Sequence, residues 1–299
     1  MNRHVARAAG SNGLSLPSST SLFWSVSVPA AVRGLALARE AESLLVRDAR
    51  HGLSLFNPRG ELQGRCTLKE LAAGCLADDG SALAAVSADR VIWLAQDLSI
   101  RWEKRLAAAG SAAALDPFGQ YVAVADQKAS LWLFDRTGKQ LGKFQSPRAI
   151  LYLAFVPASP LLVAAADFGW AGCLDLTNGK WAWSDRPVTQ IGSVAVSATG
   201  DPTMLACFSE GLRGCGPDGG NRFSLHLPKP CGLVALSFSG DMGVATGLGK
   251  ECFGFNRKGD VTSTQMLAQP PTAMALSALG GRLICGFADG SVVAREWVP

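Results

Sequence analysis

The chain has 299 residues, of which 48% are hydrophobic and only 17% are charged, and this composition excludes intrinsic disorder over most of its length. Its 33 glycines and 15 prolines indicate frequent turns, without the Gly-X-Y period of collagen or a proline-rich linker tract. The formal net charge is +4, and basic and acidic residues are interleaved along residues 40–65, so no nucleic acid is expected as a partner.

Residues 1–20 are predicted to form a disordered tail, and residues 21–299 are predicted to form a single domain. The tail is rich in serine, glycine and asparagine and lacks the apolar core of a secretory signal. No acidic residue precedes Glu40, and Arg3 and Arg7 come early in the tail. An organellar transit peptide is therefore the alternative to a cytoplasmic location.

The eight cysteines are scattered without the C-x-x-C spacing that zinc sites and redox centres normally show. Most lie in apolar runs, such as residues 205–208 and 283–285, which predicts small buried side chains rather than disulfides. Reduced thiols fit a cytoplasmic protein. The longest apolar stretch, residues 150–166, is interrupted by Pro157 and Pro160, so no membrane span is expected.

A repeat of about forty residues runs along the chain. An apolar residue that ends a short alternating run recurs at intervals of 39 to 41 residues. These anchor positions are Leu37, Leu76, Leu115, Phe155, Val196, Leu236 and Leu276. A turn of small or polar residues follows most of them, and each such turn is predicted to close a hairpin.

The third repeat shows the pattern most clearly. Its apolar runs predict strands over residues 112–115, 121–125, 130–134 and 140–144, separated by short turns. Four short strands joined by tight loops form an up-and-down sheet, and about forty residues is the length of one blade of a β-propeller. Helical periodicity of useful length is absent from the sequence.

The seventh repeat lacks a fourth strand of its own. It supplies strands over residues 273–276, 283–287 and 291–297. Residues 22–28 alternate like a strand and precede the first repeat, so they are predicted to pair with the last strand and close the ring. The sequence therefore predicts an all-β fold, a seven-bladed β-propeller of four-stranded antiparallel blades, closed by an N-terminal strand that pairs with the last blade.

Two segments carry a resemblance to known propellers. Residues 131–138 read Leu-Trp-Leu-Phe-Asp-Arg-Thr-Gly, and residues 174–183 combine an aspartate, an Asn-Gly turn and two tryptophans. On these motifs the chain resembles the seven-bladed β-propellers of the WD-repeat-like and quinoprotein-like superfamily. The resemblance covers about residues 22–299 and implies a ring of seven blades.

Few residues in the sequence could carry out catalysis. Only three histidines occur, His4, His51 and His226, and they could not form a cluster from one loop. The starts of the first strands, where a propeller enzyme would hold a metal, are almost free of carboxylates and histidines. The chain is therefore predicted not to be an enzyme and to use no metal or cofactor. The alternative is a propeller enzyme or small-ligand sensor that uses the central channel.

One acidic residue recurs in the turn between the second and third strands of every repeat. These residues are Asp48, Asp89, Asp126, Asp167, Glu210, Glu251 and Asp289. Because these turns all lie on one face of a propeller, the pattern predicts a ring of seven carboxylates that could contact a partner. The alternative is that the acids stabilise tight turns through backbone hydrogen bonds, while neighbouring bases such as Arg50 and Lys128 cancel much of their field.

Phe168 and Trp170 are the candidate aromatic contacts. They follow Asp167 in a turn where small polar residues are usual, and tryptophan is common at the centre of protein interfaces. The alternative is that Trp170 begins the third strand and packs inside the sheet. With a large surface and little chemistry, the predicted function is a non-catalytic protein–protein interaction scaffold, a subunit or adaptor of a multiprotein assembly.

Overall fold

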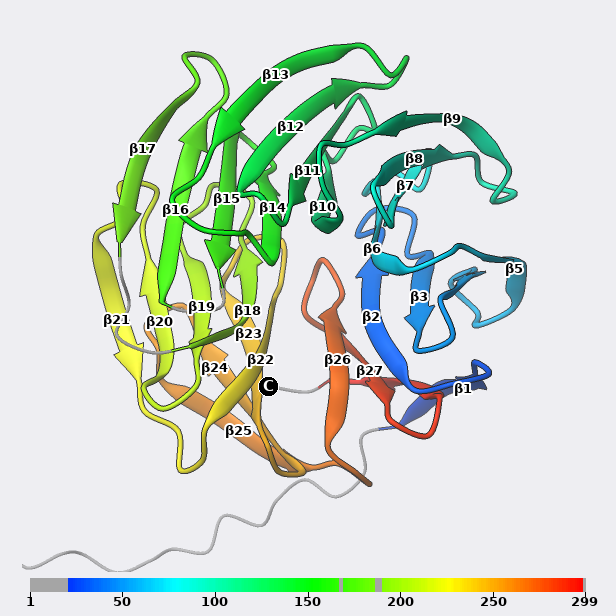
Figure 1. Ribbon diagram of the computed structural model, residues 1–299. Helices are drawn as coiled ribbons and strands as arrows, with labels where there is room; N and C mark the ends of the chain where they lie inside the picture. The colour runs from blue at the N-terminus through cyan, green and yellow to red at the C-terminus, as the bar shows by residue number, and fades with distance from the viewer. Residues whose placement is uncertain (1–20, 167–168, 186–189, 298–299) are drawn as a thin grey trace, which may run out of the picture.

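The computed structural model describes residues 21–166, 169–185 and 190–297. Within these ranges the chain forms 28 strands, arranged in seven antiparallel sheets of four strands each. The sheets surround a central axis as the blades of a propeller, with the first strand of each blade innermost (Figure 1). The predicted all-β, seven-bladed fold is confirmed.

The blades follow one another along the chain. Blade 1 contains β2 (Val32–Leu37), β3 (Leu44–Asp48), β4 (Gly52–Phe56) and β5 (Leu62–Thr67), and blade 2 contains β6 (Leu71–Leu76), β7 (Leu83–Ser87), β8 (Arg90–Leu94) and β9 (Ile100–Arg105). Blade 3 contains β10 (Gly110–Leu115), β11 (Tyr121–Asp126), β12 (Ser130–Asp135) and β13 (Gln140–Gln145), and blade 4 contains β14 (Tyr152–Val156), β15 (Leu161–Ala166), β16 (Trp170–Asp175) and β17 (Lys180–Asp185). Blade 5 contains β18 (Ile191–Val196), β19 (Thr203–Cys207), β20 (Gly211–Cys215) and β21 (Asn221–Leu225), and blade 6 contains β22 (Cys231–Leu236), β23 (Met242–Gly247), β24 (Glu251–Asn256) and β25 (Val261–Met266). Blade 7 contains β26 (Pro271–Leu276), β27 (Arg282–Phe287), β28 (Ser291–Glu296) and, as its fourth strand, β1 (Leu22–Ser27).

The position of each strand in its blade explains its sequence pattern. Second strands such as β7 and β19 are buried along their whole length, because both of their faces pack against neighbouring blades. They therefore read as continuous runs of small and branched apolar residues. Fourth strands such as β5 and β13 lie at the outer edge and alternate between exposed and half-buried residues, so polar side chains alternate with apolar ones.

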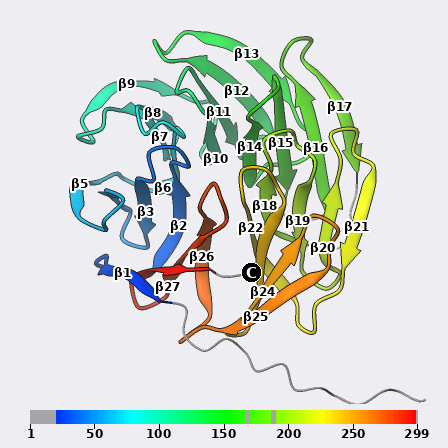
Figure 2. The same cartoon turned by 180° about the vertical axis from the view of Figure 1, so that it is seen from behind.

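Strand β1 closes the ring as predicted. It pairs antiparallel with β28, with Ser25 opposite Val293 and Ser27 opposite Ser291. Figures 1 and 2 both show this blue N-terminal strand beside the red strands of the last blade. The pairing satisfies the backbone edge of β28, and the apolar side chains of β1, Trp24 and Val26, join the core between blades 7 and 1.

At five of the blade junctions, an aromatic ring near the outer strand of one blade packs on a glycine in the third-to-fourth turn of the next blade. The pairs are Trp24 with Gly60, Trp102 with Gly138, Phe144 with Gly179, Trp183 with Gly219, and Phe223 with Gly259. Gly138 illustrates why glycine is needed: its φ is +81°, and a Cβ atom would lie 3.1 Å from the Trp102 ring.

The other two junctions reverse this arrangement. Between blades 1 and 2 the outer strand carries Gly64, and Leu98 from the next turn packs against it. Between blades 6 and 7, Trp297 packs over Gly254. All seven junctions thus combine one large side chain with one glycine, and in the two reversed cases the glycine lies on the outer strand β5 or on the third strand β24.

Alternating strand direction gives the ring two different faces. We call the face that carries the first-to-second and third-to-fourth turns the inner-turn face. The other face, here the link face, carries the second-to-third turns and the links between blades. The two faces present different side chains around the channel.

Candidate functional site

The predicted ring of seven carboxylates on the link face is not a set of free charges. Asp48 and Asp126 are buried, at 3% and 0% exposure. Asp126 Oδ1 accepts hydrogen bonds from the backbone N–H groups of Lys128 at 2.9 Å and Ser130 at 3.0 Å, and Oδ2 accepts one from the Trp132 indole at 3.0 Å. These two carboxylates stabilise their turns, which is the alternative stated above.

The remaining described members are ion-paired or turn-bound. Asp89 lies 2.6 Å from the Arg105 guanidinium, whose hydrogen bond lowers the pKa of the carboxyl. Lys229 lies 2.6 Å from Glu251 and lowers the pKa of that carboxyl in the same way. Asp289 accepts hydrogen bonds from the backbone and hydroxyl of Ser291.

The last two members of the predicted ring are Glu210 and Asp167. Glu210 is half-buried, and its backbone N–H closes its turn by donating to the Cys207 carbonyl. Asp167 lies outside the described residues. The link face therefore carries acidic residues at the predicted places, but their local partners neutralise much of their charge.

The aromatic contact predicted after Asp167 is wrong for Trp170. This residue begins β16, is 3% exposed, and packs edge to face against Trp181 with ring centroids 4.9 Å apart. Its side chain belongs to the core between blades 3 and 4, in one cluster with Leu131 and Leu162. Phe168 lies outside the described residues.

The described residues contain no group of three His, Cys, Asp or Glu side chains that could hold a metal ion. All eight cysteines are free thiols, and seven of them are buried. Burial raises the pKa of Cys75 to about 12 and that of Cys285 to about 12. Within the part of the chain that the structure describes, no helix is long and apolar enough to cross a membrane.

A depression of about 390 Å³ lies at the end of the central channel on the inner-turn face. We call it the channel mouth. The first-to-second turns of all seven blades contribute to its lining, which consists of Arg39, Glu40, Asp78, Pro117, Phe118, Pro157, Ala158, Ala198, Phe238 and Ala278. Its surface is mostly apolar, because prolines, alanines and phenylalanines occupy turns in which polar residues are usual.

Hydrogen bonds between blades hold these turns in place. The backbone N–H of Asp78 donates to the Pro117 carbonyl at 3.0 Å. On the other side of the mouth, Ala198 donates to Phe238 at 2.7 Å, and Phe238 donates to Ala278 at 2.8 Å. Because such bonds fix most of these turns to a neighbouring blade, the side chains around the mouth form a preorganised surface.

Two phenylalanines from well-separated blades stand at this mouth. Phe118 of blade 3 is 65% exposed, and Phe238 of blade 6 is 41% exposed. The Arg39 guanidinium lies 5.1 Å from the centroid of the Phe238 ring and also forms two short hydrogen bonds to the Asp78 carboxylate, at 2.8 and 3.1 Å. This pairing fixes the Arg39 side chain beside the apolar part of the mouth.

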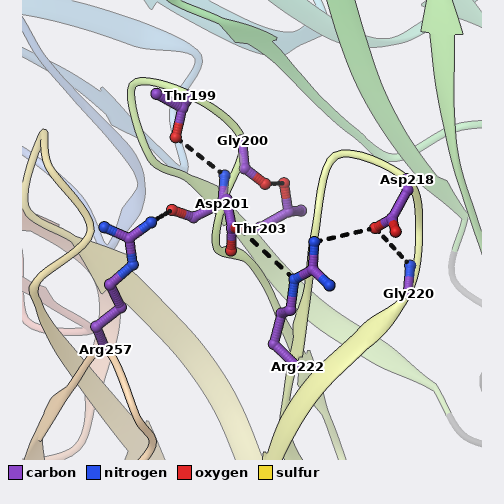
Figure 3. Close-up of polar contacts among 8 residues, drawn as sticks. All are labelled: Thr199, Gly200, Asp201, Thr203, Asp218, Gly220, Arg222 and Arg257. Atoms are coloured by element: carbon purple, nitrogen blue, oxygen red, sulfur yellow. Dashed lines mark hydrogen bonds and ion pairs between the residues drawn. The ribbon is translucent and has the colours of Figure 1, made fainter.

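Charged groups surround the apolar centre. Figure 3 shows Arg222 between Asp201 and Asp218, and Arg257 donating to the backbone carbonyl of Asp201. These contacts tie the first-to-second turn of blade 5 to the outer turns of blades 5 and 6. They also place arginines close to acidic residues, so part of the negative charge at this face is neutralised.

Phe118 and Phe238 were not among the predicted site residues. Both occupy turns that the repeat pattern locates, in the runs Pro117-Phe118-Gly119 and Phe238-Ser239-Gly240. A large aromatic residue in a turn of small residues was the available signal. Its meaning depends on the ring, which brings two turns about 120 residues apart to the same channel mouth.

A comparison of the chain with models of protein families finds no match, and a comparison with curated protein sequences finds no similar protein.

Proposed function

We propose that this protein is a non-catalytic interaction scaffold, a subunit or adaptor of a multiprotein assembly, and that it binds a protein partner at the channel mouth. The observation that carries the proposal is the apolar depression lined by Phe118 and Phe238, whose turns are hydrogen-bonded to neighbouring blades. Exposed aromatic side chains in a concave apolar surface are typical of the centre of a protein interface.

The surroundings of the mouth support binding rather than chemistry. Three charged residues line the mouth, Arg39, Glu40 and Asp78. Arg39 and Asp78 are bound to each other, and Glu40, a single carboxylate with no ion-pair partner among the described residues, does not by itself make up an acid–base pair. The turns that present the phenylalanines are fixed to their neighbours, so little ordering is required when a partner binds. These properties suit a surface that docks another protein.

The same proposal includes a cytoplasmic location and membership of a propeller superfamily. A cytoplasmic location is supported by the eight free thiols, since structural disulfides are typical of secreted proteins. Membership of the WD-repeat-like and quinoprotein-like superfamily is supported by the seven four-stranded blades together with the motifs at residues 131–138 and 174–183.

The test compares partner retention by matched variants. Tagged wild-type protein is recovered from its native host, and associated proteins are identified by mass spectrometry. The double variant Phe118→Ala, Phe238→Ala should lose a protein that the wild type retains. The control Leu248→Ala changes a residue that is 61% exposed on the link face and should retain it.

Melting curves accompany the comparison, and the double variant should unfold near the wild-type temperature because both rings are partly exposed. Retention of the same proteins by both variants would contradict docking at the channel mouth. Loss with Leu248→Ala alone would assign the partner to the link face. A small molecule recovered with the wild type and lost with the double variant would favour the ligand-sensor alternative.

A further inference from the structure

We infer that the channel mouth binds a protein segment that combines one large apolar anchor with lysine or arginine residues beside it. This inference rests on the proposed function and specifies the chemistry of the partner. It follows from the distribution of charge around the mouth, which differs from that of the opposite face.

The seven first-to-second turns are strongly acidic. They contain one basic residue, Arg39, and seven acidic residues: Glu40, Glu42, Asp78, Asp79, Asp116, Asp201 and Asp241. Three arginines from outside these turns approach them: Arg282 lies 2.9 Å from Glu42, Arg222 lies 3.6 Å from Asp201, and Arg257 lies 3.6 Å from Asp241. Seven carboxylates thus face four guanidinium groups, and an excess of negative charge remains.

Two of these carboxylates are available to a partner. Glu40 lines the mouth and is exposed. Asp79 is exposed next to Asp78, which also lines the mouth, and its Oδ1 accepts one hydrogen bond from the backbone N–H of Ser81 at 2.8 Å. Neither forms an ion pair with any residue that the structure describes. Asp116, in contrast, is buried and accepts backbone hydrogen bonds from Phe118, Gln120 and Tyr121, so it cannot reach a bound segment.

The acidic and apolar parts of the mouth lie on different blades. Glu40 and Asp79 come from blades 1 and 2, whereas the apolar lining comes from the turns of blades 3 to 7. A segment that buries an aliphatic or aromatic side chain between Phe118 and Phe238 would therefore carry its neighbouring residues over the carboxylates. Positive charge in those neighbouring residues complements this side of the mouth.

The link face has no such excess of negative charge. Its described turns and links contain six basic residues, Arg50, Lys69, Lys128, Arg148, Lys229 and Lys250, and four acidic ones, Glu70, Asp89, Glu210 and Asp289, and the strand ends beside them add Asp48, Asp126 and Glu251 together with Arg90 and Arg105. A basic segment is therefore attracted more strongly to the acidic side of the channel mouth than to the link face. Such a difference in charge favours one orientation of the partner and speeds its association, in addition to increasing the affinity.

Three short fluorescein-labelled peptides test the inference on the full-length protein. The first has a central leucine-phenylalanine pair flanked by lysines, the second has glutamates in place of the lysines, and the third has alanines in place of the central pair. Fluorescence polarisation should show binding of the first peptide, about tenfold weaker binding of the second, and loss of binding for the third. Raising NaCl from about 50 to about 300 mM should weaken the first complex.

Variants locate the effect. Glu40→Gln with Asp79→Asn should reduce affinity for the basic peptide about three- to tenfold and remove its advantage over the acidic one. The matched control Glu70→Gln removes an exposed carboxylate from the link face and should leave both affinities unchanged. All these positions are exposed, and melting curves should confirm that the variants fold.

Equal or tighter binding of the acidic peptide would overturn the inference, as would an unchanged preference in the Glu40→Gln, Asp79→Asn variant. The inference is also overturned if no peptide binds to the wild type although the Phe118→Ala, Phe238→Ala variant loses the native partner. In that last case the proposed function stands and only the charge of the partner is wrong. If the native partner remains bound to that double variant, the proposed function fails as well.

Discussion

Asp126 shows how one side chain can determine the shape of a turn. Its carboxylate is fully buried, yet both oxygens have hydrogen-bond donors, two from the backbone and one from the Trp132 indole. A buried charge is tolerated in such a site because the donors replace the water that it has lost. The same residue type at position 289 is exposed and bonds only to neighbouring polar groups.

Replacing Asp126 should therefore destabilise the protein more than replacing Asp289. Asp126→Ala leaves two backbone N–H groups and an indole N–H without acceptors, and we expect a loss of about 2–4 kcal/mol in the free energy of unfolding. Asp289→Ala is the matched control, for which we expect a much smaller change. Denaturant unfolding of both variants measures the difference, and equal losses would contradict this account of the buried carboxylate.

The limits of sequence analysis are also visible at single residues. The acid in each second-to-third turn was found from the repeat, but the sequence did not distinguish buried Asp126 from exposed Asp289. The difference comes from position: Asp126 is the last residue of β11, as buried Asp48 is of β3, whereas Asp289 lies within the turn that follows β27. Trp170 was misassigned for a related reason, because a turn boundary decides whether a tryptophan faces solvent or the next blade.

At the scale of strands and turns, the repeat predicted most of the fold. The third blade was expected over residues 112–115, 121–125, 130–134 and 140–144, and the observed strands begin or end within two residues of these limits. Alternation and turn residues are local signals, so a single sequence is enough to detect them. The pairing of a large side chain with a glycine at each junction could not be predicted, because the two residues belong to different blades.

The junctions give a prediction about elements. Gly138→Ala should lower the free energy of unfolding by about 1–3 kcal/mol, since alanine is strained at a φ of +81° and its Cβ would press on Trp102. The control Gly232→Ala places a Cβ in open space and should change stability by less than about 0.5 kcal/mol. Thermal or denaturant unfolding measures both changes in stability. Similar losses in the two variants would contradict a role for the Trp102–Gly138 contact in blade packing.

Ring closure by β1 gives a second prediction at this scale. Removing residues 1–18 should leave the melting temperature unchanged, because β1 remains. Removing residues 1–30 deletes β1, exposes the edge of β28 and part of the apolar core between blades 7 and 1, and should cause aggregation. Calorimetry and light scattering test both proteins, and equal behaviour would show that the β1–β28 pairing is dispensable.

At the scale of the whole molecule, the ring brings together residues that are far apart in the chain. The channel mouth draws its lining from every blade, at positions spaced by about forty residues. No local pattern marks such a site, so sequence analysis could supply the turns but not the depression that they form. Its charge likewise emerges only when seven turns are placed on one face.

Thiol chemistry reports on the integrity of the whole ring. Burial raises the pKa of Cys75, Cys207 and Cys285 to about 12, and only Cys66 is partly exposed. At about pH 8 a thiol reagent should therefore modify at most one cysteine in the native protein and all eight after unfolding. Rapid modification of several thiols without denaturant would mean that the blades separate.

The most direct test of docking at the channel mouth is site-specific photo-crosslinking to the native partner. A photoreactive phenylalanine analogue replaces Phe118 on the inner-turn face or Leu248 on the link face, two positions that are 65% and 61% exposed. We expect position 118 to cross-link to a partner segment that contains lysine or arginine, and position 248 to give no cross-link to that partner. Cross-linking from position 248 but not from position 118 would contradict the account.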